Sequence, residues 1–475
     1  MTAAETCVLL LYYAVLSALA VYSIHRFYLV RLRRRSPVPD RETAPVYPPL
    51  TVQLPLYNEP NVVARLIEAV ARLDYPGELE IQVLDDSTDE TSQIVESSMS
   101  AILARGVNIT HLRRAARDGY KAGALAHGVE SSRSELFAVF DADFVPPSDL
   151  LLRMVPYFAD PVVGMVQARW THLNRDESML TRVQALFLDA HFAVESAARN
   201  FGGRFFNFNG TAGIWRRSAI EDAGGWSSST LTEDLDLSYR AQMAGWRFVF
   251  LNDVEVPAEL PVALRGFQDQ QHRWAKGSLQ TARKMLPSIL ASRWRATVKA
   301  EAVFHLTNNS AYLLSVVLAL LTIPAMIVRY AYGLTWMFAI DFVLFAASSG
   351  SVLAFYREGQ RWAHRPLPRT RDLMAALPVG IGMSVRNAVA VVEGLLEEGG
   401  YFRRTPKKGD AMKAPRRPAR EPTPLYHYAE IALAVFFVGN IGAFAMSGHW
   451  ASLPFLSLFA CGYASVAITH YTSVG

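Results

Sequence analysis

The stretch LFAVFDADF, residues Leu136–Phe144, decides the fold class of this chain. Its first five residues are apolar, which is typical of a strand buried on both faces of a sheet. The strand ends in two aspartates at alternate positions, and ligands of open α/β folds bind at the carboxyl ends of strands. Carboxylate oxygens suit Mg²⁺ or Mn²⁺, ions that usually also hold substrate phosphates, so Asp141 and Asp143 are candidate metal ligands. A lone pair of this kind is more often a solvated turn.

Two apolar runs upstream end in the same way. They are Leu50–Pro55, followed by Tyr57 and Glu59, and Ile81–Leu84, followed by Asp85 and Asp86. A helical pattern over residues 61–73 separates the runs, and this β-α-β alternation predicts a largely parallel sheet. Converging carboxylates repel one another unless a cation lies among them. The alternative is a set of helix caps, since residues 87–89 suit the start of the next helix.

Three more polar clusters follow along the chain. They are the small-residue loop Phe208–Gly213, the acidic patch Leu231–Asp236 and the mixed amide, cation and indole cluster Gln270–Trp274. Lys121 follows a Gly-Tyr turn, where its ammonium suits a phosphate as a point charge, although a solvated lysine is the alternative.

Together these segments resemble the motifs of membrane-embedded family 2 glycosyltransferases, the group of cellulose, chitin and hyaluronan synthases. The resemblance is strongest to the plant cellulose-synthase-like mannan and glucan synthases. The matching segments, in the family's order, are Gln53–Glu59, Val83–Asp89, Gly119–Leu125, Phe140–Phe144, Val166–Trp170, Phe208–Trp215 and Gln270–Trp274. The resemblance is dense from Pro48 to Pro287, and it implies an α/β fold of the GT-A, Rossmann-like type with an α-helical transmembrane region.

Hydropathy predicts several membrane spans. The chain of 475 residues is 51% hydrophobic with a mean hydropathy of +0.13, and its apolar residues are concentrated in segments. These are Cys7–Ile24, Ala311–Val328, Leu334–Tyr356, Ile431–Met446 and Leu453–Ile468. Since a span needs about 20 residues, the last two require flanking polar-aromatic residues, and a buried hairpin is their alternative. The two cysteines, Cys7 and Cys461, lie in these segments and exclude a disulfide framework or zinc cluster in the remaining domain.

The basic residues set the orientation. Arg31 and Arg33–Arg35 follow the first span, and a basic loop covers 357–371, so the large domain is expected to be cytoplasmic. Residues 1–6 lack Lys and Arg, which argues against a cleaved signal peptide. The basic residues beside the spans fit anionic membrane lipids, and no nucleic-acid motif is present. The plain N-terminus and short loops favour a bacterial inner membrane, with a Golgi membrane as the alternative.

Residues 373–396 are ambiguous, because they are long enough to span but hold Arg386, Asn387 and Glu393. We predict an amphipathic helix in the membrane interface there, and another near residues 286–301. The predicted division is a transmembrane helix (1–30), a cytoplasmic GT-A domain (45–285), an interfacial helix (286–301), two spans (302–357), an interfacial helix with a basic gating-type loop (373–424) and two spans (428–472).

A nucleotide-diphosphate sugar carries a charged leaving group, and the chemistry of its transfer suggests a role for each candidate residue. A divalent ion, Mg²⁺ or Mn²⁺, on Asp143 and Asp141 would neutralise the departing diphosphate. The donor-binding candidates are Tyr57, Glu59, Asp85, Asp86, Lys121, Asp141, Asp143 and Arg273. Asp85 and Asp86 suit ribose and nucleoside hydroxyls, and Arg273 suits the diphosphate. The resemblance implies that Tyr57 and Glu59 lie beside the base of the nucleotide.

The resemblance also implies that Asp234, next to Glu233, is the catalytic base that takes the proton of an acceptor hydroxyl. A helix N-terminus at this point would lower the pKa of Asp234 unless burial offsets the effect. The acceptor-binding candidates are Asn209, Gly210, Thr211, Gln271 and Trp274. Trp274 offers a flat face for a sugar ring, with an interfacial membrane anchor as its alternative. Phe402–Lys407 resembles a gating-loop motif, with Arg404 where cellulose synthases carry Val.

The favoured function is inverting, metal-dependent transfer of a hexose from GDP-mannose or UDP-glucose to make a β-linked, 1,4-linked polysaccharide. One alternative is a non-processive transferase with a lipid acceptor, which the small number of spans supports. A different class is a catalytically silent transporter or scaffold, against which the intact acidic clusters argue. The motifs do not distinguish the two donors.

Overall fold

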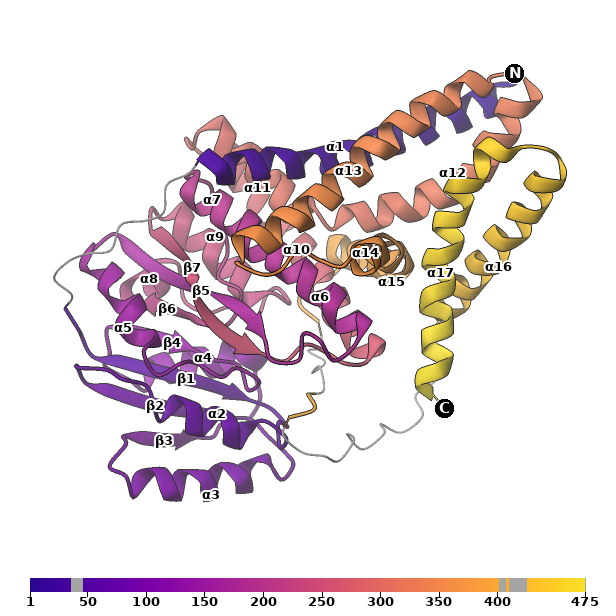
Figure 1. Cartoon of the computed structure of the whole chain (residues 1–475). Coiled ribbons are helices and arrows are strands. Elements are labelled where there is room, and N and C mark those ends of the chain that lie inside the picture. The colour runs from indigo at the N-terminus through magenta and orange to yellow at the C-terminus, as the bar shows by residue number, and fades with distance from the viewer. Residues whose placement is uncertain (36–45, 401–406, 410–424, 475) are drawn as a thin grey trace.

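A computed structural model of the chain describes residues 1–35, 46–400, 407–409 and 425–474. An α/β domain occupies one side of the molecule, and long helices project away from it on the other side (Figure 1). The N-terminus and the C-terminus both lie among these projecting helices (Figure 1). The chain therefore starts and ends outside the α/β domain, as the distribution of apolar segments predicts.

One mixed sheet of seven strands forms the centre of the α/β domain, in the order β3-β2-β1-β4-β6-β5-β7. The strands are β1 (Leu50–Leu56), β2 (Leu79–Asp85), β3 (Ile109–Leu112), β4 (Leu136–Val139), β5 (Val163–His172), β6 (Gly213–Arg216) and β7 (Arg247–Ala258). β1 pairs in parallel with β2 and β4, with Leu50 opposite both Leu79 and Leu136. β6 runs antiparallel between β4 and β5. The parallel half is the half that the β-α-β alternation predicts.

Burial explains why these runs are strands. All four residues of β4 are fully buried, and the sheet separates two apolar clusters, one packed around Val52 and Leu54 and the other around Phe137 and Trp215. The helices of this domain are α2 (Val63–Val70), α3 (Thr91–Leu103), α4 (Tyr120–Glu130), α5 (Leu150–Met154), α6 (Met179–Ala190), α7 (Ala197–Phe201), α8 (Arg217–Asp222), α9 (Glu233–Met243) and α10 (Leu264–Ala291). A 3₁₀ turn, η1 (Val155–Ala159), follows α5, and a π-helical turn, η2 (His191–Ser196), joins α6 to α7.

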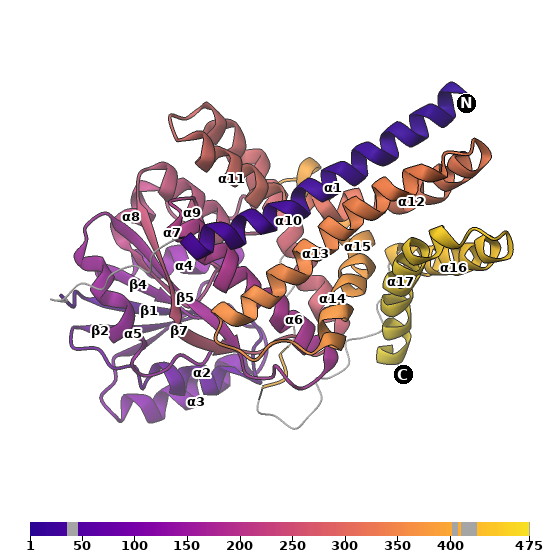
Figure 2. The same ribbon diagram turned by 45° about the horizontal axis from the view of Figure 1, so that its top comes forward.

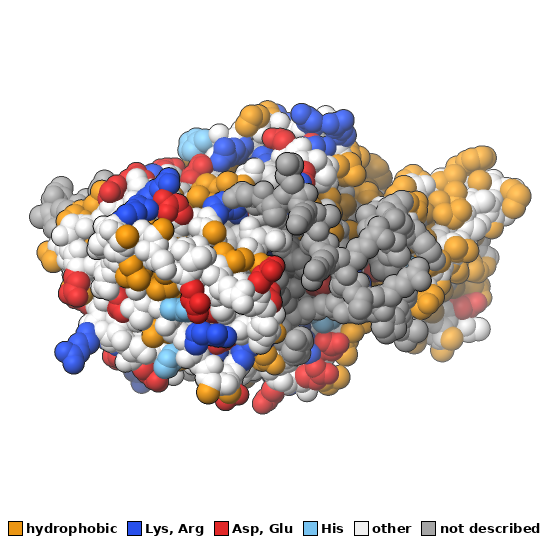
Figure 3. Space-filling model, turned by 90° about the horizontal axis from the view of Figure 1, so that it is seen from below, with side chains coloured by type: hydrophobic (Ala, Val, Ile, Leu, Met, Phe, Trp, Pro, Cys, Tyr) orange, Lys and Arg blue, Asp and Glu red, His pale blue; other side chains and the backbone are white. Residues whose placement is uncertain are grey.

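The helices beyond the sheet include five that are long and apolar enough to cross a membrane. The helices outside the α/β domain are α1 (Ala3–Arg35), α11 (Ala296–Thr307), α12 (Ser310–Ala331), α13 (Phe338–Trp362), α14 (Thr370–Gly382), α15 (Ser384–Leu396), α16 (Leu425–Met446) and α17 (Leu453–Val474). Two 3₁₀ turns, η3 (Thr335–Met337) and η4 (Trp450–Ser452), precede α13 and α17. Apolar side chains are concentrated at the helical end of the molecule, whereas charged ones are spread over the α/β domain (Figure 3).

The five candidate spans are α1, α12, α13 with η3, α16 and α17, and they coincide with the five apolar segments of the sequence. Two other segments differ from the expectation. Residues 373–396 form two helices, α14 and α15, bent by 50° at a break, rather than one interfacial helix. Residues 286–301 contain the end of α10, a turn and the start of α11, because α10 continues through Pro287 to Ala291.

α1 packs on the α/β domain as well as on the helical bundle. Figure 2 shows α1, α12 and α13 running side by side away from the sheet. His25 of α1 lies 2.8 Å from Glu301 of α11, and Arg33 donates a hydrogen bond to the carbonyl of Ala193 in η2. The first helix of the chain thus contacts the segment that lies beside the pocket described next.

Candidate active site

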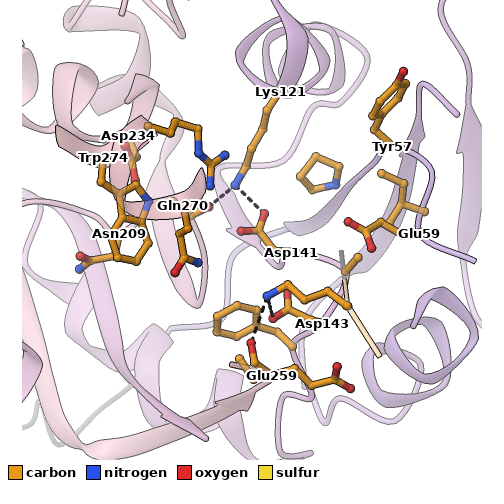
Figure 4. Close-up of a pocket in the computed structure, with 18 of the residues that line it drawn as sticks. Tyr57, Glu59, Lys121, Asp141, Asp143, Asn209, Asp234, Glu259, Gln270 and Trp274 are labelled. Atoms are coloured by element: carbon orange, nitrogen blue, oxygen red, sulfur yellow. Dashed lines mark hydrogen bonds and ion pairs between the residues drawn. The ribbon is translucent and has the colours of Figure 1, made fainter. Parts of the chain in front are cut away.

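A pocket lies at the carboxyl ends of β1 and β4, between the sheet and helices α9 and α10 (Figure 4). Its polar and aromatic lining residues include Tyr57, Glu59, Asp86, Arg117, Lys121, Asp141, Asp143, Trp170, His172, Asn209, Thr232, Glu233, Asp234, Glu259, Gln270, Arg273, Trp274 and Lys407. Most of the sequence-predicted site residues are therefore brought together by segments that are far apart in the chain.

The end of β4 places two carboxylates in the pocket, each facing a lysine (Figure 4). Lys121 Nζ lies 2.5 Å from Asp141 Oδ1 and also donates to the carbonyl of Gly210. Lys407 Nζ lies 2.6 Å from Asp143 Oδ2 and donates to the carbonyl of Glu259. Burial works against the charged form of Lys121, but Asp141 and Glu233 outweigh it and raise its pKa. Both aspartates are thus paired with a lysine inside the pocket.

The end of β2 separates its two aspartates. Asp86 lines the pocket and is bound by Arg114, whose Nε and Nη2 donate to its two oxygens at 3.0 and 2.5 Å. Asp85 points the other way and is almost fully buried. It accepts hydrogen bonds from the backbone N–H of Ser87 and the hydroxyl of Ser92, and His111 lies 3.1 Å from it. The expectation that Asp85 contacts the donor is corrected, because local partners take up both of its oxygens.

These partners also explain the charge of Asp85. Burial alone would raise the pKa of its carboxyl, but hydrogen bonds from His111, Ser87 and Ser92 outweigh burial and lower the pKa. The cap alternative for residues 87–89 is met in part, since Asp89 accepts a hydrogen bond from the N–H of Thr91 at the start of α3.

The end of β1 supplies an aromatic and an acidic side chain. Tyr57 and Glu59 both line the pocket, at some distance from Asp234 and Trp274 in the view of Figure 4. The guanidinium of Arg117 lies over the ring of Tyr57, 3.3 Å from its centroid. Asn58 between them has a positive φ of 57° and accepts a hydrogen bond from the N–H of Thr88, which ties the end of β1 to the end of β2.

Asp234 lies in the first turn of α9 and projects into the pocket. Burial and the neighbouring Glu233 raise its pKa to about 7, against the opposing effects of Lys121 and Arg273. Burial therefore outweighs the helix N-terminus that would lower this pKa. A carboxyl with such a pKa takes up and releases a proton near neutrality, which suits general base catalysis.

The loop before β6 approaches Asp234 with its backbone. Gly210 has φ = +82°, and a Cβ added to it would lie 3.0 Å from Asp234 Oδ2, so glycine is required here for two reasons. Asn209 lines the same pocket. Thr211 does not, because it is fully buried and its hydroxyl accepts a hydrogen bond from the N–H of Asp141. Thr211 therefore supports Asp141 instead of contacting the acceptor as predicted.

Helix α10 contributes Gln270, Arg273 and Trp274 to the pocket, one turn of helix apart. Gln271 was predicted to bind the acceptor, but it is not among the lining residues. It lies next to the lining residue Gln270 on α10. With a helical period of 3.6 residues, Gln270 and not Gln271 shares a face with Arg273 and Trp274. Burial lowers the pKa of Arg273, with Glu233 and Asp141 opposing.

Sequence reasoning missed Arg117, Glu259, Gln270 and Lys407 as lining residues. The helical spacing of α10 was a sufficient signal for Gln270. Arg117 comes from the loop before α4 and Glu259 follows β7, and neither has a sequence signal of its own. Lys407 is the last residue of the gating-type motif, but that motif did not assign it to the pocket. Residues 402–406 of that motif lie outside the described residues.

The pocket fits a divalent ion accompanied by a phosphate ligand. Among the described residues, no group of three or more His, Cys, Asp or Glu is arranged around a common metal position. Asp141 and Asp143 nevertheless each bind an ammonium group, so two positive charges already occupy the places where a cation would neutralise them. Mg²⁺ in such sites is held by one or two carboxylates and completed by substrate phosphates and water. The residues present match that pattern.

A family model described as "Glycosyltransferase like family 2" matches residues 48–277. Residues 48–277 are a family 2 glycosyltransferase domain. The match covers the whole sheet and the part of α10 that lines the pocket. The family predicted from the ordered motifs is thereby confirmed for this part of the chain.

The relatives include glucomannan 4-beta-mannosyltransferase 1 of Oryza sativa subsp. japonica, 40% identical over 310 residues, which are 62% of this chain and 60% of the relative. Glucomannan 4-beta-mannosyltransferase 2 of Arabidopsis thaliana is 45% identical over 253 residues, 52% of this chain and 47% of the relative. The chain spans about half to three fifths of the length of the curated relatives it matches. These relatives are plant proteins, so they give no support to the expected bacterial inner membrane.

The domain also resembles a solved structure. The mannosyltransferase PcManGT of Pyrobaculum calidifontis, solved with GDP-Man and Mn²⁺, matches with a TM-score of 0.54 and 21% identity over 82% of this chain and 99% of that one. The predicted GT-A fold is confirmed.

Proposed function

We propose that this chain is an inverting, metal-dependent hexosyltransferase that transfers mannose from GDP-mannose to build a β-1,4-linked polysaccharide at a membrane. The observation that carries the proposal is the composition of one pocket. A pair of carboxylates at the end of β4 shares the pocket with Asp234, a half-buried carboxyl whose pKa is raised to about 7. A diphosphate leaving group and a catalytic base require these two features on opposite sides of one sugar.

Six residues receive the donor in this proposal. Asp141 and Asp143 would hold the divalent ion, which when bound neutralises the charge that develops on the diphosphate. Lys121 and Arg273 line the same space and add positive charge. Tyr57 and Glu59 extend the pocket away from Asp234, where the base of the nucleotide would lie. The bond of Lys121 with Asp141 and that of Lys407 with Asp143 must loosen when the donor enters.

The transfer step then needs no covalent enzyme intermediate. The oxygen of the acceptor hydroxyl forms a bond with the anomeric carbon, and its proton passes to the carboxylate of Asp234. The bond between the anomeric carbon and the diphosphate oxygen breaks, and the diphosphate leaves with both electrons. Because attack and departure occur on opposite faces, an α-linked donor gives a β-linked product.

The choice of sugar rests on the relatives. The rice and Arabidopsis proteins are named as glucomannan 4-beta-mannosyltransferases, and the archaeal enzyme of the same fold was solved with GDP-Man. Both observations favour GDP-mannose over UDP-glucose. Trp274 is proposed as the platform on which a ring of the acceptor glycan stacks.

The membrane arrangement is part of the proposal. With Arg31 and Arg33–Arg35 at the inner end of α1, the glycosyltransferase domain faces the cytoplasm, and the basic residues beside the spans contact anionic lipids. The five candidate spans would form the exit path of the polymer.

The test is incubation of the detergent-purified chain with radiolabelled GDP-mannose or UDP-glucose and Mn²⁺ or Mg²⁺. We expect a high-mass product from GDP-mannose that β-mannanase digests. Asp234→Asn is expected to lower transfer about 10²–10⁴-fold while donor binding persists. Turnover of this variant at the wild-type rate would refute the assignment of the base.

A glycolipid product is the competing outcome. The number of candidate spans favours it, since five helices form a thin wall for a polymer channel. Label found in a single-sugar lipid, with none in polymer, would replace the polysaccharide proposal. Absence of any donor turnover with either sugar would favour a silent scaffold instead.

A further inference from the structure

His191 begins the π-helical turn η2, which continues from α6 without a break. π-helical turns occur mostly at functional positions. The imidazole of His191 lies between two polar side chains: Nε2 is 2.9 Å from Asn209 Oδ1, and Nδ1 is 3.0 Å from Glu195 Oε2. Since Asn209 lines the pocket beside Asp234, His191 stands directly behind the proposed acceptor site.

The amide orientation of Asn209 follows from its neighbours. The side-chain nitrogen of Asn207 donates to the carbonyl of Phe208 at 3.1 Å, which fixes the orientation of the Asn207 amide. The same nitrogen lies 3.1 Å from Asn209 Oδ1, and Asn209 Nδ2 donates to the carbonyl of Asn207 at 3.3 Å. A flipped Asn209 amide would place two N–H donors face to face. Asn209 therefore presents its oxygen to His191.

This orientation determines which ring nitrogen of His191 donates to Asn209. An amide oxygen only accepts hydrogen bonds, so Nε2 of His191 must carry a hydrogen. Glu195 Oε2 lies 3.0 Å from Nδ1 on the other side of the ring. Both nitrogens of His191 therefore have a side-chain partner, which holds the ring in one orientation.

Charged and titratable groups from several elements lie around His191. They are Glu195 and Arg199 on its own helical run, Glu301 and His305 on α11, His25 and Arg26 on α1, and Tyr356 on α13. Arg199 bridges the two carboxylates, at 3.5 Å from Glu195 and 2.9 Å from Glu301. His305 stays neutral because burial lowers its pKa well below the ordinary value. Glu195, the partner of His191, is thus itself held by Arg199 and linked to α11.

We propose that His191 is a positioning residue that fixes Asn209 so that one amide N–H points to an oxygen of the acceptor sugar. The inference rests on the proposed function and deepens it. Asn209 Nδ2 carries two hydrogens, and within the part of the chain that the structure describes one of them is used, by the carbonyl of Asn207. The next residue, Gly210, abuts Asp234. An acceptor hydroxyl that accepts from Asn209 keeps its own proton for Asp234.

The arrangement separates the acceptor side of the pocket from the donor side. Without the ring of His191, the amide of Asn209 is no longer held in one orientation. Acceptor binding should then weaken, whereas donor binding at Asp141 and Asp143 should not change.

The test compares variants of the full-length protein with a β-1,4-linked manno-oligosaccharide as acceptor. His191→Leu removes the hydrogen bond to Asn209 and is expected to raise the acceptor KM at least about tenfold, with the GDP-mannose KM unchanged. His191→Gln supplies an amide N–H in place of the ring N–H, so it should restore the acceptor KM. Asn209→Asp, which lacks the amide N–H, should lose acceptor binding. His111→Gln, at the histidine beside Asp85 outside the pocket lining, is the matched control.

Tryptophan fluorescence measures binding of the oligosaccharide directly. This measurement separates a loss of acceptor binding from a loss of sugar transfer. Unaltered acceptor binding in His191→Leu would overturn the role of His191 while the proposed function stands. Oligosaccharide binding that depends on His191, in a protein that transfers no sugar, would overturn the proposed function and retain the positioning role. Failure of the wild-type protein to bind the oligosaccharide would overturn the positioning role, whatever the transfer assay gives.

Discussion

The ends of β2 and β4 carry the same kind of sequence, an apolar strand followed by two aspartates, but they use it differently. At β2, Asp85 is bound by Ser87 of the following loop, Ser92 of α3 and His111 of the adjacent strand β3. At β4, Asp141 and Asp143 face Lys121 and Lys407, which come from distant segments. One strand end is closed by local hydrogen bonds, whereas the other is held only by displaceable ammonium groups.

The comparison teaches that the partners of a carboxylate, rather than its place at a strand end, decide whether it can bind a ligand. A carboxylate with three local hydrogen bonds supports the fold, and removing it leaves buried donors unsatisfied. A carboxylate paired with a lysine exchanges one cation for another at small cost. Four predictions test this distinction, from the largest expected effect to the smallest.

Asp143→Asn should have the largest effect, because it removes a charged oxygen ligand at the open strand end. We expect transfer to fall about 10³-fold and Mn²⁺-dependent binding of GDP-mannose to be lost. Calorimetry with Mn²⁺ and donor, alongside the radiolabel assay, measures both. Melting temperature should change little, and a variant that keeps metal-dependent donor binding would place the metal elsewhere.

The activity that depends on Asp234 should change with pH, whereas Asp85 should contribute no change. Burial raises the pKa of Asp234 to about 7, and a base works only when ionised, so kcat/KM should rise about tenfold per pH unit below that pKa and then level off. Asp85, with a lowered pKa, stays ionised over this range and contributes no such change. The pH profile of kcat/KM measures this, with donor binding over the same range as the control. An acid limb that persists in the residual activity of Asp234→Asn would belong to another group.

Asp85→Asn should reduce stability rather than catalysis. Asparagine has one acceptor oxygen where the carboxylate has two, so at least one buried donor loses its partner, at a cost of about 1–3 kcal/mol. Thermal unfolding in detergent measures the loss, and the KM for GDP-mannose should equal that of the wild type. A large increase in donor KM at unchanged stability would restore Asp85 to the donor site.

Lys407→Ala tests whether the ammonium of Lys407 and the metal ion compete for Asp143 at the end of β4. Without the ammonium beside Asp143, we expect Mn²⁺ to bind a few-fold more tightly, by about 1 kcal/mol. Lys408→Ala is the matched control, because Lys408 pairs with the exposed region around Glu177 rather than with the pocket. Weaker Mn²⁺ binding in Lys407→Ala would instead mean that Lys407 helps to retain the donor.

Much of the fold follows from the sequence because its signals are local. The apolar runs before Tyr57, Asp85 and Asp141 predict the parallel strands β1, β2 and β4, and hydropathy predicts the five candidate spans. The antiparallel strand β6 lies between β4 and β5 only through long-range pairing. The break between α14 and α15 could not be predicted either, because residues 373–396 are enough to form one helix.

The site was predictable where a motif projects its side chains directly into the pocket. Asp143, Asp234 and Trp274 are examples. Asp85, Thr211 and Gln271 do not line the pocket, but each adjoins a residue that does, because a motif gives the segment but not the direction of each side chain. Alternation along a strand and the turn of a helix decide that direction.

The contact of α1 with the rest of the molecule has a consequence for biogenesis. His25 and Glu301 are separated by 276 residues in the chain, and at about 5–20 residues per second the ribosome needs tens of seconds to make the second partner after the first. During that time the domain emerges while Arg199 still lacks Glu301. Until α11 is made, the nascent chain must keep α1 in the membrane and must prevent aggregation of the domain in which Arg199 has no Glu301 partner. This interval is therefore the step at which a chaperone or the insertion machinery is most needed.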